Sequence, residues 1–196
     1  MTLPIIALGN EILRKISKPV VVEDEKIETL LDEMWISMNE SDGVGLAAPQ
    51  VNRSLNLFVI NTKIMYERLT DDERINLFPD EKGIKETFIN TKIVSHSEIT
   101  WSDYEGCLSI PGVYETVERS WEITLEYFDE NFNAHTRSFS GYNAKVIQHE
   151  YDHTQGVLFI DRLSPLRKKL LKSKLNRIVV GKVNTNYPIV FKKHTS

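Results

Sequence analysis

The segment from Ser140 to Gly156 constrains the fold of this chain more than any other. Ser140 or Asn143 can cap a helix, and Gly156 can end one in a left-handed conformation. The predicted helix carries His149-Glu150-Tyr151-Asp152-His153, in which two histidines four residues apart lie on one face. Apolar neighbours place this helix at least partly in the core; they are Ala144, Val146 and Ile147. The rest of the chain must therefore pack around it and supply polar partners for buried imidazoles.

The two histidines form an H-E-x-x-H motif, which is typical of a metal site. Both imidazoles can bind one ion, and Glu150 follows the first ligand directly, where a carboxylate can act as acid and base on water at the metal. The alternative is a surface helix with two unrelated histidines. A catalytic site usually has three protein ligands and one open position, so a third ligand is needed.

Cys107 is the natural candidate for that third ligand. The position six residues after His153 is Phe159, and no glutamate follows Glu150, so the usual downstream ligands are missing. Cys107 lies in Glu105-Gly106-Cys107-Leu108-Ser109, where glycine allows a tight backbone path. Its alternative role is that of a small buried apolar residue. A Cys-His-His set suits Zn²⁺, Fe²⁺, Co²⁺ or Ni²⁺.

The remaining pattern predicts an α+β fold, with antiparallel strands around the central helix that carries the motif and with N-terminal and C-terminal helices. Apolar residues recur at helical spacing over residues 23–39, and Glu23 or Asp24 favours that N-terminus. Strands are expected over 57–60, 88–94, 123–127 and 134–139, and residues 61–86 are expected to be a surface excursion. A last helix should begin at Ser164-Pro165 and turn three leucines inward, namely Leu166, Leu170 and Leu171.

Length and composition favour one globular domain. The 196 residues are 41% hydrophobic and 27% charged, and no run approaches the roughly 20 apolar residues of a membrane span. We therefore expect no membrane association, and the N-terminus does not resemble a signal peptide. The single cysteine, Cys107, favours a reducing compartment and so a cytoplasmic location. Residues 1–165 are expected to form the metal-dependent catalytic domain, with residues 166–196 as the C-terminal helix and basic tail of the same domain.

Charge is distributed unevenly along the chain. No acidic side chain follows Asp161, whereas ten of the 24 lysines and arginines do. A basic terminal segment is typical of contact with nucleic acid. The alternative is a helix with a solvated basic face, docked on an acidic body.

Three segments together resemble the signature motifs of peptide deformylases. They are Gly43-Val44-Gly45-Leu46-Ala47-Ala48-Pro49-Gln50, the Glu105–Ser109 segment, and Gln148-His149-Glu150-Tyr151-Asp152-His153. The order and relative positions also fit, and the N-terminal Leu8-Gly9, Leu13-Arg14 and Pro19-Val20 are similar to the opening of that family. The resemblance covers roughly residues 4–165.

The resemblance implies a hydrolase that removes the N-formyl group from the starting methionine of new polypeptides and releases formate. It implies one divalent metal, Fe²⁺ natively, with Zn²⁺, Ni²⁺ or Co²⁺ as replacements. It assigns the Gln50 side-chain amide and the Leu108 backbone N–H as donors to the formyl oxygen. It also suggests that the basic tail contacts the ribosome near the exiting chain.

Further residues are expected to bind substrate or support the ligands. Gly45 should offer backbone groups to an extended peptide, and an apolar pocket should accept the methionine side chain, with Val44, Tyr142 and Val146 as its candidates. Arg119 is expected to pair with Glu105, and Asp152 to support a ligand indirectly or to face solvent.

Three other functions compete with this interpretation. A metalloprotease would cleave internal peptide bonds, a non-enzymatic module would use the metal to hold its fold together, and a thiol hydrolase would use Cys107 as a nucleophile. The missing downstream glutamate or histidine argues against the protease.

Overall fold

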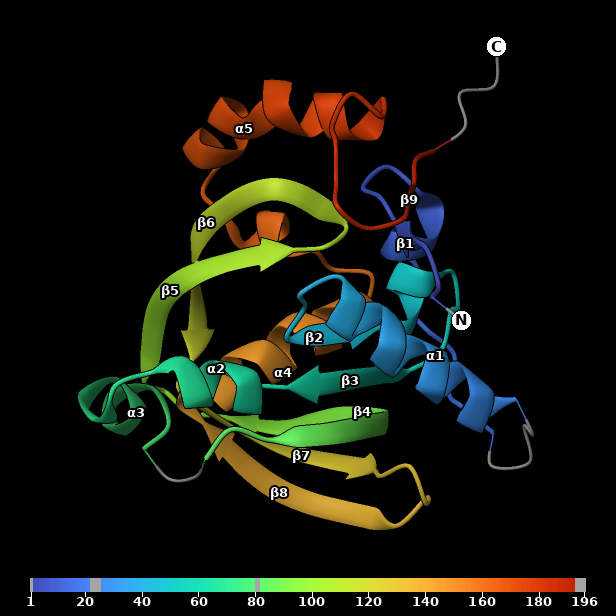
Figure 1. Ribbon diagram of the computed structural model, residues 1–196. Helices are drawn as coiled ribbons and strands as arrows, with labels where there is room; N and C mark the ends of the chain where they lie inside the picture. Colours follow the sequence, from blue (N-terminus) through green and yellow to red (C-terminus); the bar gives the residue numbers. More distant parts are fainter. Residues whose placement is uncertain (1, 22–25, 80–81, 193–196) are drawn as a thin grey trace.

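A five-stranded antiparallel sheet forms the base of the molecule (Figure 1). The computed structural model describes residues 2–21, 26–79 and 82–192. The sheet has the order β2-β3-β4-β7-β8, and every neighbouring pair is antiparallel. Its strands are β2 (Gly45–Ala47), β3 (Leu57–Asn61), β4 (Lys85–His96), β7 (Glu122–Phe128) and β8 (Ala134–Ser140).

Two smaller sheets complete the β structure. Strands β5 (Thr100–Cys107) and β6 (Ile110–Ser120) form a long antiparallel hairpin. Strands β1 (Ile5–Ile6) and β9 (Ile189–Val190) pair in parallel and bring the two ends of the chain together. The hairpin and the β1–β9 pair lie above the large sheet in Figure 1.

The helices are mostly short, and only one is almost completely buried. The α-helices are α1 (Ile27–Glu40), α2 (Lys63–Arg68), α3 (Asp71–Leu77), α4 (Gly141–Thr154) and α5 (Pro165–Val179). Short 3-10 helices span Glu11–Arg14, Ala48–Val51 and Phe159–Arg162. The predicted α+β class with antiparallel sheets is confirmed. Within the described parts of the chain, no helix is long and apolar enough to cross a membrane.

Helix α4 lies between the large sheet and the β5–β6 hairpin (Figure 1). Its apolar residues Ala144, Val146 and Ile147 belong to the core cluster that includes Phe58, Phe88 and Phe139. Ser140 stands at its N-cap in extended conformation, and Gly156 follows its end with a φ of 74°. The expected start and stop residues are therefore confirmed, and this helix contacts both sheets at once.

Most of the other predicted elements are confirmed. The strands expected over 57–60, 88–94, 123–127 and 134–139 lie within β3, β4, β7 and β8. The helix predicted over 23–39 is described from Ile27, whereas Glu23 and Asp24 lie outside the described residues. The hairpin of β5 and β6 was not predicted, although it carries one of the motifs.

The stretch over 61–86, expected to be a surface excursion, holds two short helices, α2 and α3. Neither helix has a buried residue, so both lie at the surface. Thr70 and Glu73 cap α3 reciprocally, and Tyr66 stacks edge-on against Phe78 at 5.3 Å. Local capping and this aromatic contact therefore give the segment helical structure.

The inward orientation predicted for two leucines of α5 is wrong. Leu166 and Leu170 are each 66% exposed, and only the third leucine, Leu171, packs against the core. Leu171, Leu175 and Ile178 form the stripe that faces the body. Leu170 lies about 100° around the helix from Leu171, so it faces away when that stripe faces in.

Candidate metal centre and its cavity

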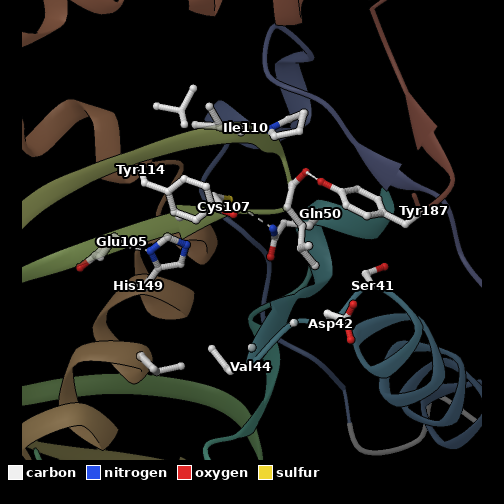
Figure 2. A pocket seen from close by; sticks show the side chains of 18 of the residues that line it. Ser41, Asp42, Val44, Gln50, Glu105, Cys107, Ile110, Tyr114, His149 and Tyr187 are labelled. Carbon is white, nitrogen blue, oxygen red and sulfur yellow. Dashed lines mark hydrogen bonds and ion pairs between the residues drawn. The ribbon is translucent and has the colours of Figure 1, made fainter. Parts of the chain in front are cut away.

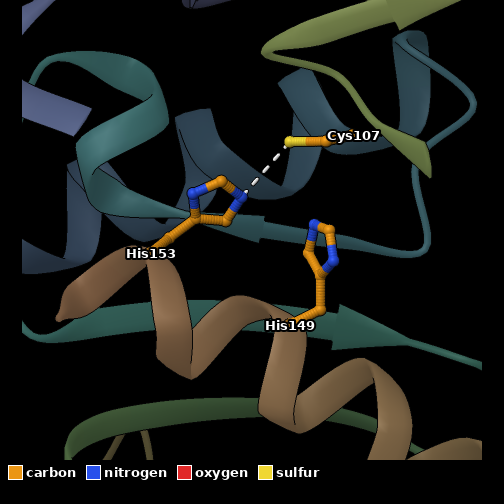
Figure 3. A group of neighbouring side chains, drawn as sticks. All are labelled: Cys107, His149 and His153. Atoms are coloured by element: carbon orange, nitrogen blue, oxygen red, sulfur yellow. Dashed lines mark hydrogen bonds between the residues drawn. The ribbon is translucent and has the colours of Figure 1, made fainter. Parts of the chain in front are cut away.

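Two histidine side chains of helix α4 and one cysteine from a distant segment converge (Figure 3). One ligand atom from each of Cys107, His149 and His153 lies within 4.8 Å of the others. The Cys107 Sγ is 3.3 Å from the Nε2 of His153. Both histidines come from successive turns of α4, and Cys107 ends β5 at an irregularity of the hairpin register.

The chemistry of this donor set fits a metal. One sulfur and two imidazole nitrogens are ligands that Zn²⁺, Fe²⁺, Co²⁺ and Ni²⁺ accept. His153 Nδ1 is buried and has no hydrogen-bond partner among the described residues, whereas His153 Nε2 is the ring nitrogen that faces the Cys107 sulfur. The three residues therefore fit a single divalent ion, as predicted.

A buried ionic network fixes the orientation of His149. Its Nδ1 is 2.8 Å from a Glu105 carboxylate oxygen, and Arg119 donates to both oxygens of Glu105 at 2.7 and 2.9 Å. Burial alone would raise the pKa of Glu105, but the bonds from Arg119 and His149 hold it well below its usual range. The predicted pair of Arg119 and Glu105 is present, and Glu105 leaves His149 Nε2 as the ring nitrogen free to face a metal.

Asp152 joins the same network from α4. It accepts from Arg119 Nη1 at 2.6 Å and from Arg162 at 2.7 Å through both Nε and Nη2. Asp152 is therefore buried and does not face solvent. Its partners in these hydrogen bonds are arginines, not a histidine. The hydrogen bonds that connect Asp152 to His149 run through Arg119 and Glu105.

Glu150 lies in the cavity next to the cluster. Burial raises the pKa of its carboxyl to about 7. Its Oε2 is buried without a hydrogen-bond partner in the described parts of the molecule. A Cβ placed on Gly45 would lie 2.5 Å from Oε1, so glycine at position 45 is what lets this carboxylate lie against β2. A carboxyl that titrates near neutral pH is suited to both accept and donate a proton.

Gln50 and Leu108 line the same cavity as Glu150. The Gln50 Oε1 accepts from the Ala47 N–H at 2.9 Å, which turns its Nε2 toward Ser109 Oγ at 3.3 Å and Cys107 Sγ at 3.5 Å (Figure 2). The backbone bond to Ala47 therefore fixes which end of the amide is the donor.

A cavity of about 670 Å³ opens over these residues. Ten of the predicted site residues line it: Val44, Gly45, Gln50, Glu105, Cys107, Leu108, Tyr142, Val146, His149 and Glu150. Arg119, Asp152 and His153 are not among the lining residues. Sequence reasoning missed other parts of the wall, which are Ser41–Asp42, the hairpin residues Tyr104 and Tyr114, Lys145 and the tail residues 184–187.

Comparison with known proteins identifies the family. The polypeptide deformylase family model matches residues 2–169. A peptide deformylase of Christiangramia forsetii is 44% identical over 193 residues, which cover 97% of this chain and 96% of the relative. One from Flavobacterium psychrophilum is 42% identical over 187 residues and covers 95% of each chain.

Solved structures agree with the sequence relatives. A peptide deformylase from Plasmodium falciparum has a TM-score of 0.77 at 34% identity, covering 90% of this chain and 95% of its own. A plant peptide deformylase has a TM-score of 0.79 at 32% identity, with coverage of 92% and 90%. From this family match over nearly the whole sequence and from relatives above 40% identity, we conclude that the chain belongs to the peptide deformylase family.

Proposed function

We propose that this chain hydrolyses the N-formyl group of formylmethionine on newly made polypeptides, releasing formate, with the residues around α4 as its active site. Members of the family remove N-formyl groups from nascent polypeptides and depend on a metal. The observation that supports the site assignment is the convergence of Cys107, His149 and His153 beside the buried carboxyl of Glu150. Under this proposal α4 is the central helix of the enzyme.

Cys107, His149 and His153 would hold one divalent ion, which we propose to be Fe²⁺ natively and replaceable by Zn²⁺, Ni²⁺ or Co²⁺. When bound, such an ion supplies Lewis acidity toward water and the formyl oxygen. Glu105 accepts a hydrogen bond from the Nδ1–H of His149, so that the Nε2 lone pair remains available to bind the ion.

Glu150 is the proposed acid and base. It takes a proton from the attacking water as the new C–O bond forms at the formyl carbon, and it delivers that proton to the methionine nitrogen as the C–N bond breaks. The remaining proton of the water passes from the product acid to the amine, so the products are formate and the protonated amine of methionine, and the carboxylate of Glu150 is regenerated. Negative charge on the formyl oxygen is stabilised by the Gln50 amide and the Leu108 N–H; loss of one such donor typically costs about 10²–10³ in rate.

The substrate backbone is proposed to extend the large sheet at β2. This strand is at one edge of the sheet, and Gly45 lines the cavity there. A peptide that adds to an edge strand gains main-chain hydrogen bonds without contributing sequence specificity. The methionine side chain would enter the part of the cavity lined by Val44, Tyr142 and Val146, all of which belong to or pack against one apolar core cluster.

The C-terminal helix is proposed to belong to the same domain as the catalytic body and to contact the ribosome. Helix α5 exposes a set of cations that includes Lys168, Lys169, Lys172, Lys174 and Arg177. Such a surface attracts the phosphate backbone of RNA, and the attraction weakens as salt is added. Co-sedimentation with ribosomes at rising salt tests the contact; binding without salt dependence would contradict an electrostatic role.

Formate release separates the proposed function from its competitors. The purified, anaerobically loaded enzyme is incubated with formyl-Met-Ala-Ser and, in parallel, with Met-Ala-Ser. We expect formate and Met-Ala-Ser from the first peptide and no cleavage of the second. Internal fragments would indicate a metalloprotease, and activity that survives chelation would indicate a thiol hydrolase. Either result would refute the proposal.

A further inference from the structure

The chain after α5 returns to the active site as an extended segment. Half-buried residues alternate with exposed ones from Val183 to Lys192, so alternate side chains face the body. Val183, Ile189 and Phe191 pack against the core cluster under α5. Residues 184–187 line the cavity that contains Glu150 and His149.

Backbone pairing on its C-terminal side anchors this segment. The N–H of Ile5 donates to the Pro188 carbonyl and that of Ala7 to the Val190 carbonyl, both at 2.9 Å. Within the segment, the Thr185 hydroxyl donates to the Tyr187 carbonyl at 2.7 Å. Tyr187 is therefore positioned by its neighbours on both sides, directly before the residue that joins β1.

The Tyr187 hydroxyl reaches across to the catalytic loop. It donates to the Leu108 carbonyl at 2.8 Å, and Figure 2 shows the ring at the edge of the cavity. Leu108 follows Cys107 directly in the sequence. The bond therefore holds the residue that carries the proposed N–H donor and that is joined to the proposed sulfur ligand. Burial raises the pKa of the Tyr187 hydroxyl, so it keeps its proton and remains a donor across the physiological range.

The next residue of the loop is held from other directions. The Ser109 carbonyl accepts from the Leu8 N–H at 2.8 Å, and its hydroxyl contacts the Gln50 amide at 3.3 Å. Tyr187 supplies the side-chain bond to Leu108 itself. Leu108 and Ser109 are thus held at three atoms: the Leu108 carbonyl by the tail, the Ser109 carbonyl by the N-terminal segment and the Ser109 hydroxyl by Gln50.

We propose that Tyr187 is a positioning residue for deformylation: its hydroxyl holds the Leu108 carbonyl and thereby keeps the Cys107 sulfur and the Leu108 N–H in their working orientation. This inference rests on the proposed function. It assigns the tail residues 184–187 to the wall of the active site, in addition to the basic surface that α5 presents.

Tyr187→Phe tests the hydroxyl while keeping the ring. In the full-length, metal-loaded enzyme, loss of one neutral hydrogen bond should lower kcat for formyl-Met-Ala-Ser by about threefold to tenfold, with KM within about twofold. A residue that only stabilised the fold would leave kcat unchanged at temperatures well below Tm. A higher KM at unchanged kcat would also overturn the proposal, because it would make Tyr187 a substrate contact.

Hydrogen–deuterium exchange supplies a readout that does not depend on activity. The peptide containing residues 105–109 should exchange about threefold to tenfold faster in Tyr187→Phe than in the wild type. Tyr66→Phe on α2 is the matched control, because it makes the same chemical change outside the cavity wall. It should leave kcat and the loop exchange at wild-type values.

A second variant keeps the test decisive if Tyr187→Phe is poorly folded. Thr185→Val retains Tyr187 but removes the hydrogen bond from the Thr185 hydroxyl to the Tyr187 carbonyl. We therefore expect kcat to fall and loop exchange to rise, each by less than in Tyr187→Phe. A wild-type protein that releases no formate would refute the proposed function, whereas the exchange experiment would still report on the loop. Unchanged exchange and unchanged kcat in both variants would refute the role of Tyr187 alone.

Discussion

Helices α4 and α5 are almost equal in length, yet the charged side chains of α4 are buried and those of α5 are exposed. Every residue of α4 except Tyr151 is buried, including Lys145, Glu150 and Asp152. In α5 only Ile178 is buried, and the lysines and arginines of this helix are exposed. Two of the buried charges have close partners: Lys145 contacts Asp103 and the Tyr104 carbonyl, and Asp152 contacts two arginines.

The difference between the two helices reflects what surrounds each of them. A buried charge costs much free energy unless it is paired, so a helix such as α4 holds such groups only where the surrounding fold supplies partners. Glu150 is the exception, because one of its oxygens is buried without a partner among the described residues. Exposed charges of α5 contribute little to stability and remain available for electrostatic contact with another molecule.

The largest difference between the helices should be seen in turnover. Glu150→Gln removes the proposed acid and base while preserving the size of the side chain. We expect kcat/KM for formyl-Met-Ala-Ser to fall by about 10²–10⁴. Metal content by elemental analysis should stay near the wild-type value. Full activity in this variant would show that the buried carboxyl has no role in proton transfer.

The next largest effect should be on folding, through Arg119. Arg119→Met leaves both Glu105 and Asp152 short of a cation in a buried site. Breaking such a buried pair typically costs about 3–5 kcal/mol in the free energy of unfolding, which urea titration would measure. Arg162→Met is the control: it also removes a partner of Asp152, but its side chain is 42% exposed, so less than about 1 kcal/mol is expected. Equal losses would mean that burial does not distinguish the two arginines.

A smaller effect should appear in the pH dependence of stability of the metal-free protein. The pKa of Glu150 is about 7 in the fold against 4.5 ordinarily, so the folded state binds this proton more tightly than the unfolded state. Its contribution is therefore fully present below about pH 4.5 and is lost as pH rises through about 7. Between about pH 5 and pH 8, Tm should fall further in the wild type than in Glu150→Gln. Parallel Tm curves would contradict the raised pKa.

The smallest effect on stability should come from α5. Replacing Lys169, Lys172 and Lys174 together with alanine should change the free energy of unfolding by no more than about 0.5 kcal/mol per site. Deformylation of a short peptide should be unchanged, whereas ribosome association at low salt should weaken. A loss of peptide turnover in this variant would mean that the two helices are not functionally separate.

Much of the candidate site could be predicted because its geometry is local. The spacing of His149 and His153 places both on one face of any helix, and Glu150 necessarily lies beside them. Cys107 required more: the missing downstream ligand and the Glu105–Ser109 motif indicated it, but only the hairpin of β5 and β6 brings its sulfur to α4. The contact of Glu105 with Arg119 depends on the same hairpin, but its register places Arg119 opposite Trp101 and Glu105 opposite Glu115, so the contact is diagonal and does not follow from strand pairing alone.

What the sequence alone determined is therefore the candidate ligands, the candidate acid and base, the family motifs and four of the five strands of the large sheet, because these depend on spacing within one element or on the order of short segments. Only the tertiary structure decided which leucines of α5 face inward and how the tail returns to the cavity. Ile5 pairs with Ile189 across most of the chain, and Tyr187 reaches Leu108, which is 79 residues away in the sequence. No local periodicity encodes such contacts, because they form only when separately folded elements pack together.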